Sequence, residues 1–195
     1  MSSARTDAPQ PDFQPGEAVV YPSRGVGQIT ALEQQEVAGV RLELFVIFFD
    51  KRKVVLRVPT AKAARQGLRR LATPAQLEQA LAVLSRPARV TRAVWIRRAQ
   101  EYTVKLRSGD LIALAEVVRD LHHPKGQSEA SFSERELYEE AVDLITPEIA
   151  VIKGTTHAEA LRLIEQRLRS GDHLDGNSMK EDVAKAAGSG ARRRA

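Results

Sequence analysis

Residues 41–59 read RLELFVIFFDKRKVVLRVP, and this stretch decides the fold of the first half of the chain. Its run of consecutive apolar residues, Leu44–Phe49, is typical of a strand that is buried on both faces. Residues 50–52 then predict a turn. In the next segment, Lys53–Val58, one side of the chain is wholly apolar, which predicts a second strand. The outward face of that strand carries Lys53, Val55 and Arg57.

Two further strands precede this stretch. Residues 17–21 alternate as a short strand, and residues 26–37 predict a longer one after a turn at residues 22–25. Gly39 then suits a hairpin, because glycine tolerates the positive φ that tight turns require. Four or five short strands joined by tight turns predict a small SH3-like or Tudor-like β-barrel.

The second half of the chain predicts an all-α domain of five short helices. Their starts are marked by Thr73-Pro74, Thr91 and Asp110, and by capping boxes that open at Ser133 and Thr156. The predicted helices span about residues 73–84, 91–107, 110–121, 133–145 and 156–168.

Together these segments predict an α+β chain of two domains, a small β-barrel followed by a helical domain. We expect the barrel to occupy residues 13–71 and the helical domain to occupy residues 72–170. The flanking segments, 1–12 and 171–195, contain few large apolar residues and are predicted to be disordered.

Composition excludes several classes of protein. The 195 residues include no cysteine, which excludes disulfide frameworks, thiolate catalysis and cysteine-ligated zinc. No run of about 18 apolar residues predicts a membrane span, and the first residues lack the apolar core of a secretory signal. We expect a cytoplasmic protein that does not bind membranes.

Charge is segregated along the chain. Residues 51–109 contain 15 Lys and Arg but only two acids, a net charge of +13, whereas residues 110–148 have ten acids and three bases, a net charge of −7. A compact block of positive charge repels itself unless an anionic partner offsets it. The block therefore favours nucleic acid as a partner, and a solvated basic surface is the alternative.

Catalytic chemistry is not indicated. The sequence lacks the GxxxxGK[ST] pattern of a P-loop, and none of its four histidines has the i, i+4 partner of a helical zinc site. We find no pairing of a nucleophile with a base. We therefore expect no enzyme activity, no cofactor and no metal.

Trp95 is the chain's single tryptophan and lies within a cluster of arginines. The cluster consists of Arg86, Arg89, Arg92, Arg97 and Arg98. An apolar side chain among phosphate-binding cations is the combination that wedges a base step in the DNA minor groove. Trp95 also begins an apolar stripe with Tyr102 and Leu106, which is typical of a core position. Its place in the first turn of the helix favours the wedge, with the core position as the alternative.

Several motifs resemble the CarD/CdnL family of bacterial transcription regulators. In the first half they are VVYP (19–22), Gly25, Gly27 and VLRVP (55–59), and in the second half WIRR (95–98), KLRSGD (105–110) and AEVVRDL (115–121). Phe132-Ser133, Glu136 and Ala141 fit the next helix of the family. The resemblance covers residues 13–168, with the motifs in the family's order.

The resemblance implies a function in transcription. The Tudor-like domain would bind the RNA polymerase β subunit, and the helical domain would meet promoter DNA at the upstream edge of the transcription bubble. Trp95 matches the family's wedge tryptophan, Arg97 and Arg98 match its basic neighbours, and Arg57 matches a polymerase-contacting arginine. The chain would then be nucleoid-associated, a monomer when free, and would stabilise the open promoter complex.

The sequence departs from the family at two positions. Gln35 stands where some members have a polymerase-contacting arginine, so that contact is lost or replaced by Arg41, and Gln100 stands where some have a basic residue. Lys53 and Val55 complete the expected polymerase surface. The alternative is a protein-only adaptor that does not bind DNA. A methyl-lysine reader is disfavoured because the barrel has no tryptophan for a cage.

Overall fold

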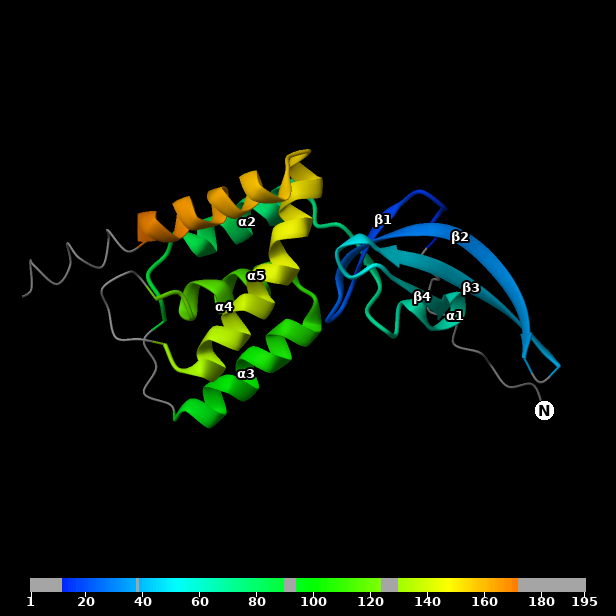
Figure 1. Ribbon diagram of the computed structural model, residues 1–195, viewed down its shortest axis with the longest axis horizontal. Coiled ribbons are helices and arrows are strands. Elements are labelled where there is room, and N and C mark those ends of the chain that lie inside the picture. The colour runs from blue at the N-terminus through cyan, green and yellow to red at the C-terminus, as the bar shows by residue number, and fades with distance from the viewer. Residues whose placement is uncertain (1–11, 38, 90–93, 124–129, 172–195) are drawn as a thin grey trace, which may run out of the picture.

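The computed structural model describes residues 12–37, 39–89, 94–123 and 130–171. Figure 1 shows a curved sheet from the first part of the chain beside a bundle of helices from the rest. The predicted α+β class, a Tudor-like β domain followed by a helical domain, is confirmed, and the β domain is one antiparallel sheet. Within these residues no helix combines the length and the apolar character that a bilayer span needs. Most of both predicted disordered tails lies outside the described residues, and Gly171, the first residue of the second, is helical and buried.

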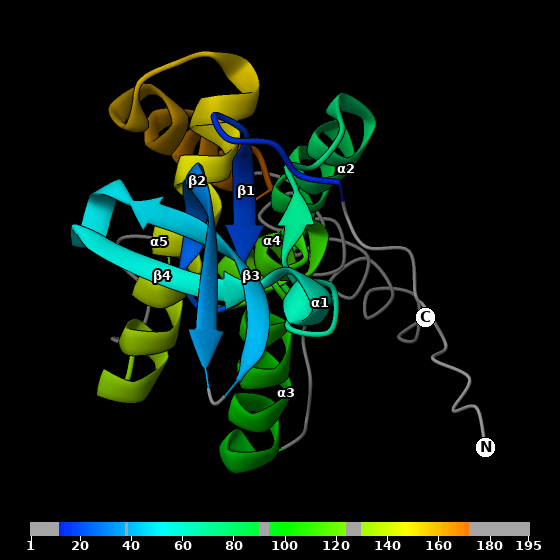
Figure 2. The same ribbon diagram turned by 90° about the vertical axis from the view of Figure 1, so that its right-hand side faces the viewer.

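Five antiparallel strands form one sheet. They are β1 (Ala18–Tyr21), β2 (Gly25–Val37), β3 (Val40–Phe49), β4 (Val54–Pro59) and β5 (Arg69–Arg70). Their order across the sheet is β4-β3-β2-β1-β5, so β4 and β5 are its edges. Figure 2 looks onto this sheet, with the helices behind it. The first four strands match the predicted segments, whereas a strand as short as β5 carries no periodic pattern.

The core of the sheet is built on β3. Ile47 is fully buried, and Phe45 and Phe49 of the same cluster are nearly so. Phe13 packs edge-to-face on Phe45, with ring centroids 5.7 Å apart. Gly27 of β2 faces this core, where a Cβ atom would lie 2.7 Å from Ile47 Cγ2. Glycine is therefore required for β2 to approach β3 this closely.

The link between β3 and β4 differs from the prediction. Asp50–Arg52 form one 3₁₀ turn, η1, and the N–H of Lys53 donates to the Asp50 carbonyl. Because this bond closes the turn at Lys53, which has a φ of 51°, β4 begins at Val54. Lys53 therefore precedes the strand instead of lying on its outward face. After β4, Thr60–Ala63 form a short helix, α1, that the sequence pattern does not predict.

The helical body follows the sheet. Its helices are α2 (Pro74–Leu84), α3 (Trp95–Ser108), α4 (Leu111–Asp120), α5 (Phe132–Lys153) and residues 157–171. Three predicted caps are confirmed, because the side-chain oxygens of Thr73, Asp110 and Thr156 accept from backbone N–H groups three residues later. α3 begins later than predicted, at Trp95, with Val94 as its N-cap, and Thr91 lies outside the described residues.

The start and end of α5 also differ from the prediction. Ser131 and Glu134 form its capping box, two residues before the predicted box at Ser133. Both Ser-x-x-Glu patterns are present in the sequence. Because the helix begins at Phe132, Ser131 is its N-cap and the earlier pattern forms the capping box. The helix continues through Pro147, well beyond Ile145, because its far half is held by packing.

A second hydrophobic core lies among the helices and is separate from that of the sheet. α4 contributes five almost fully buried residues, Leu111, Leu114, Ala115, Val117 and Val118. The surrounding helices contribute Leu81, Leu84, Tyr102, Leu106, Ile145, Ile149 and Ile164. Each body therefore has its own core, and both polar contacts and the packing of β2 against α5 join the two.

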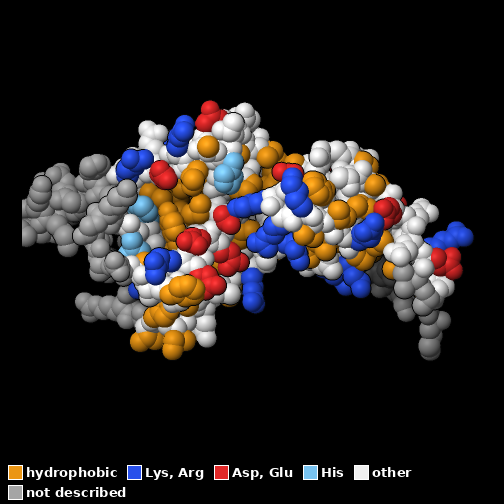
Figure 3. All heavy atoms as spheres, in the orientation of Figure 1, with side chains coloured by type: hydrophobic (Ala, Val, Ile, Leu, Met, Phe, Trp, Pro, Cys, Tyr) orange, Lys and Arg blue, Asp and Glu red, His pale blue; other side chains and the backbone are white. Residues whose placement is uncertain are grey.

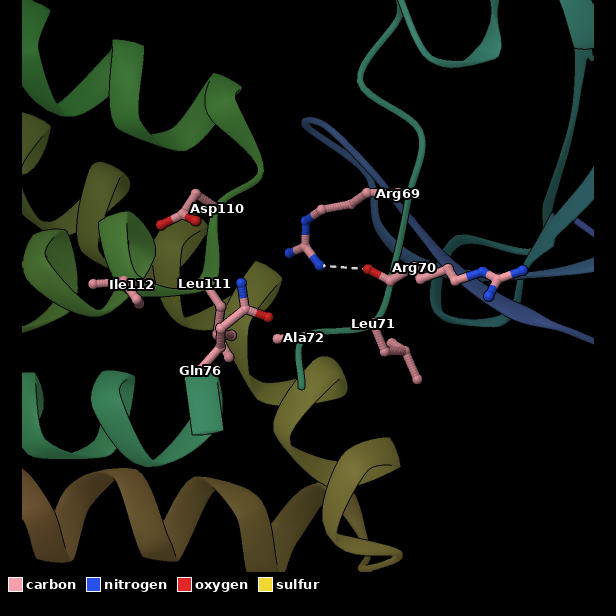
Figure 4. Close-up of a pocket in the computed structure, with 8 residues that line it drawn as sticks. All are labelled: Arg69, Arg70, Leu71, Ala72, Gln76, Asp110, Leu111 and Ile112. Carbon is pink, nitrogen blue, oxygen red and sulfur yellow. Dashed lines mark hydrogen bonds between the residues drawn. The ribbon is translucent and has the colours of Figure 1, made fainter. Parts of the chain in front are cut away.

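A buried ion pair is the main polar contact at this joint. Arg69 of β5 donates to both carboxylate oxygens of Glu148 on α5, at 2.7 and 2.8 Å, and Glu148 is fully buried. The same guanidinium donates to the carbonyl of Gly109, the residue that ends α3. In Figure 4, Arg69 points toward the helices and Arg70 points away from them.

The central position of β3 predicts a contrast between two of its residues. Ile47→Ala should lower the free energy of unfolding by about 2–5 kcal/mol, because it opens a cavity in a closed core. Val40→Ala, on the same strand but 58% exposed, should change it by no more than about 0.5 kcal/mol. Urea denaturation measures both, and equal losses would contradict the described core.

Candidate functional site

The first candidate surface is the outward face of β4. Val55 is 47% exposed, and Arg57 is exposed on the same face, opposite Val46 of β3. Arg57 Nε donates to Glu33 Oε2 of β2 at 2.9 Å, so the two side chains meet across β3. The hydrogen bond and the negative charge of Glu33 raise the pKa of Arg57. Because β4 is an edge strand, its outer backbone groups are open to a partner strand.

The other two predicted polymerase-binding residues lie apart from this face. Lys53 pairs with Asp50 and lies over the Phe48 ring, at the start of β4. Arg41 is exposed near the hairpin end of β3, opposite Glu36. It is three residues beyond the last pairing of β3 with β4, or about 10 Å along the strand. The structure therefore brings Val55 and Arg57 together, with Lys53 beside them, and leaves Arg41 at a distance.

The basic block is less positive in three dimensions than along the sequence. Bases of residues 51–109 pair with acids, most of them from other segments: Lys51 with Asp143, Lys53 with Asp50, Arg57 with Glu33, Arg69 with Glu148, Arg70 with Glu17, Arg97 with Glu101, Arg98 with Glu134 and Lys105 with Glu116. Much of the expected self-repulsion is thus offset inside the chain. No described carboxylate forms an ion pair with Arg52, Lys62, Arg65, Arg86, Arg89 or Arg107.

Trp95 combines features of both interpretations made from the sequence. It is the first residue of α3, is partly buried, and packs against the helical core. The Arg98 guanidinium lies 5.2 Å from the Trp95 ring centroid, and its Nη2 donates to Glu134 Oε1 at 3.1 Å. Arg98 therefore ties the start of α3 to the start of α5 and holds the indole in place, while Trp95 keeps an exposed part.

The outer surface of α3 is apolar beside Trp95 and basic farther round. Ile96 and Val104 are 71% and 69% exposed, and with Trp95 they line a shallow hollow of about 480 Å³. A second hollow of about 480 Å³ is lined by Arg89, Arg97 and Lys105, among others. Figure 3 shows hydrophobic side chains gathered at the end of the helical body where α3 begins. This surface can take up an apolar group and an anion side by side.

The predicted DNA-binding arginines occupy different positions around this surface. Arg97 is exposed and pairs loosely with Glu101, at 3.8 Å. Arg89 is held through its backbone N–H, which donates to Asp120 Oδ1 at 3.0 Å, so its side chain is free to reach outward. Arg86 is exposed after α2, and Arg92 lies outside the described residues.

Glu134 has a role that the sequence analysis missed. The acidic run from Glu134 to Glu140 resembles a solvated helix face, yet Glu134 is partly buried. Burial would raise its pKa, but hydrogen bonds from the N–H and Oγ of Ser131 and the nearby charges of His123 and Arg98 outweigh burial, so its pKa lies below the ordinary 4.5. The Ser131-x-x-Glu134 capping box is the signal that could have found it.

Among the described residues, no group of three or more His, Cys, Asp or Glu side chains could hold a metal ion.

Comparison with known proteins decides the family. The family model for the CarD-like/TRCF RID domain matches residues 13–72, and the model for the CarD C-terminal domain matches residues 79–165. The chain belongs to the CarD/CdnL family. The resemblance seen in the sequence is thereby confirmed across both bodies of the structure.

Other members of the CarD/CdnL family resemble this chain over different lengths. The "Putative transcription factor YdeB" of Bacillus subtilis (strain 168) is 28% identical over 147 residues, which are 75% of this chain and 96% of the relative. The solution structure of the N-terminal domain of Myxococcus xanthus CarD is 33% identical and covers 30% of this chain and 77% of that one. Its TM-score of 0.27 is too low to carry an argument about the fold.

The lowered pKa of Glu134 predicts a pH dependence for this CarD/CdnL-family chain. A folded-state pKa below the unfolded value stabilises the fold above the unfolded pKa, and this contribution is lost as pH falls through the folded value. Between about pH 5 and pH 3, the unfolding free energy should fall more steeply for the unmodified chain than for Glu134→Gln. The exposed Glu136→Gln should follow the unmodified chain. Denaturant titrations at several pH values test this, and parallel profiles for all three proteins would contradict it.

Proposed function

We propose that this protein is a transcription regulator that stabilises the open promoter complex. In this proposal, residues 13–71 bind the RNA polymerase β subunit, and residues 72–170 bind promoter DNA near the bubble. The observation that carries it is the surface of α3, where a partly exposed Trp95 lies beside apolar and basic hollows in the domain matched by the CarD C-terminal model.

The polymerase contact is supported by the edge position of β4. An exposed edge strand can add to a partner's sheet through main-chain hydrogen bonds, while its side chains supply specificity. Val55 and Arg57 stand on the outward face of this edge. The Arg57–Glu33 pair is exposed, and exposed pairs add little to stability, so a carboxylate of the partner can compete for the guanidinium at little cost.

The DNA contact is supported by the surface of α3. Arg89 and Arg97 line one hollow and can bind phosphates, which fixes the register of the helix on the duplex. Trp95 and Ile96 line the neighbouring apolar hollow. An apolar edge beside phosphate-binding cations suits a widened or kinked minor groove, where a base step is partly unstacked. Such a groove is present at the edge of a transcription bubble.

The mechanism is a shift in population. A ligand moves an equilibrium only by its difference in affinity for the two states. Attached to polymerase, α3 would have a high local concentration at the upstream DNA, so weak phosphate contacts would suffice. Because Trp95 would fit the distorted groove better than regular duplex, binding would favour the open complex.

A protein-only adaptor is the second candidate. It is favoured by the many ion pairs that offset the basic block inside the chain. The two candidates differ in their response to salt, because DNA affinity falls steeply with salt when phosphate contacts release counterions. Absence of any DNA affinity at low salt would favour the adaptor.

Arg57→Glu should abolish co-purification with the polymerase β subunit, because it reverses the charge at the centre of the proposed contact. Arg162→Glu makes the same charge change on the helix of residues 157–171, outside the sheet, and should leave co-purification intact. The double variant Arg57→Glu with Glu33→Arg restores the internal ion pair but not the charge at position 57, and should also fail to bind. Unchanged melting temperatures confirm folding, and normal binding by folded Arg57→Glu would overturn this contact.

Trp95→Ala should shorten the lifetime of open complexes while leaving polymerase binding unchanged. Because Trp95 is only partly buried, the variant should lose less stability than the roughly 3–5 kcal/mol of a fully buried tryptophan. Arg97→Glu should also shorten the lifetime, by repelling phosphate, and its effect should shrink as salt rises. Arg162→Glu, exposed on the helix of residues 157–171, is the matched control. Unchanged lifetimes for both Trp95→Ala and Arg97→Glu would rule out this surface.

A further inference from the structure

Arg69 and Glu148 meet in a fixed geometry at the joint between the sheet and the helices. Nη1 of Arg69 donates to one oxygen of Glu148 at 2.7 Å, and Nη2 donates to the other at 2.8 Å. The N–H of Ala72, in the segment that links the two bodies, donates to Glu148 Oε1 at 2.9 Å. A bidentate pair of this kind fixes direction as well as distance.

The same guanidinium reaches the end of α3. Arg69 Nε donates to the Gly109 carbonyl at 2.8 Å, and Nη2 donates to the same oxygen. Gly109 is the left-handed C-cap of α3, with a φ of 67°, and packs against Pro22 beside β1. One side chain of the sheet thus grips the C-terminal end of α3, while Trp95 lies at the other end of the helix.

The other contacts across the joint do less to fix the orientation of the sheet relative to the helices. Lys51 pairs with Asp143 at 2.7 Å, but both side chains are about half exposed. A Cβ atom at Gly25 would lie 3.5 Å from Leu144 Cδ2, so β2 passes close to α5 at this point. Small packed surfaces can slide past each other, and exposed ion pairs reorient readily. Neither contact therefore fixes the angle between the sheet and the helices as the Arg69–Glu148 pair does.

We infer that Arg69 and Glu148 are positioning residues, which set where the DNA-facing end of α3 stands relative to the polymerase-facing strand β4. This inference rests on the proposed function for its consequence. The 14 residues of α3 form a lever of about 20 Å, at 1.5 Å per residue. If the helical body tilted by about 10° about Gly109, Trp95 would therefore move by about 3–4 Å, which is one base step along a DNA strand. The pair thereby sets the register in which a polymerase-bound chain meets DNA.

The structural half of the test uses the absence of cysteine in the chain. Spin labels on Lys62→Cys in α1 and Gln79→Cys in α2, both exposed positions, report the distance between the two bodies. The unmodified joint should give one narrow distance distribution. Glu148→Gln and Arg69→Lys should each broaden or shift it, and Lys51→Gln, which breaks only the exposed pair, should not. Arg69→Lys retains the charge but loses the bidentate fork, so it serves if Glu148→Gln does not fold.

The functional half measures polymerase affinity and open-complex lifetime with the unlabelled full chain. Arg69→Lys should keep polymerase affinity within about twofold and lose most of the lifetime gain, whereas Lys51→Gln should keep both. A narrow, unshifted distribution in folded Arg69→Lys would overturn the inference, as would a broadened one with the full lifetime gain. If the unmodified chain fails to extend the lifetime, the proposed function fails, and the distance distributions alone then decide whether the pair positions α3.

Discussion

The Arg69–Glu148 ion pair is the interaction on which the arrangement of the two bodies depends. Taking a carboxylate out of water costs several kcal/mol, and only a bidentate partner with further hydrogen bonds offsets that cost. Glu148 has both, because Arg69 and the N–H of Ala72 complete its contacts. Loss of Arg69 would leave the buried charge of Glu148 unpaired, at about 3–5 kcal/mol. Stability alone does not require such a pair, since apolar residues in its place often give an equally stable protein. A fixed orientation of the sheet relative to the helices does require it.

Separate cores give the protein two surfaces that can be tuned independently. The sheet buries its aromatic cluster around β3 and leaves β4 as an edge. The helices bury their own hydrophobic core around α4 and leave one side of α3 exposed. Val55 and Arg57 on the edge and Arg97 on α3 are exposed, and Trp95 is only partly buried. Substitutions there can change binding without unfolding the chain, which suits a protein that bridges two partners.

Local sequence patterns predicted most of the helices and strands. They could not predict contacts between residues that are distant in the sequence. Strands β1 and β4 follow from alternation, β3 follows from a run of apolar residues, and the helix starts at Thr73, Asp110 and Thr156 follow from single capping side chains. Arg69 and Glu148 are 79 residues apart, so no spacing could pair them. The same reason explains the basic block, whose bases find acids such as Glu134 on other elements. Trp95 could not be settled as core or wedge, because one face packs on the core and another stays exposed.

The central claim is that the chain prefers polymerase on melted DNA to polymerase on intact duplex. The most direct measurement is the affinity of the full chain for polymerase bound to fully paired promoter DNA and to a pre-melted fork of the same sequence. The account predicts tighter binding to the forked complex, where a tenfold difference would correspond to about 1.4 kcal/mol of open-complex stabilisation. Equal affinity for the two complexes would contradict it, because a ligand without a preference shifts no equilibrium.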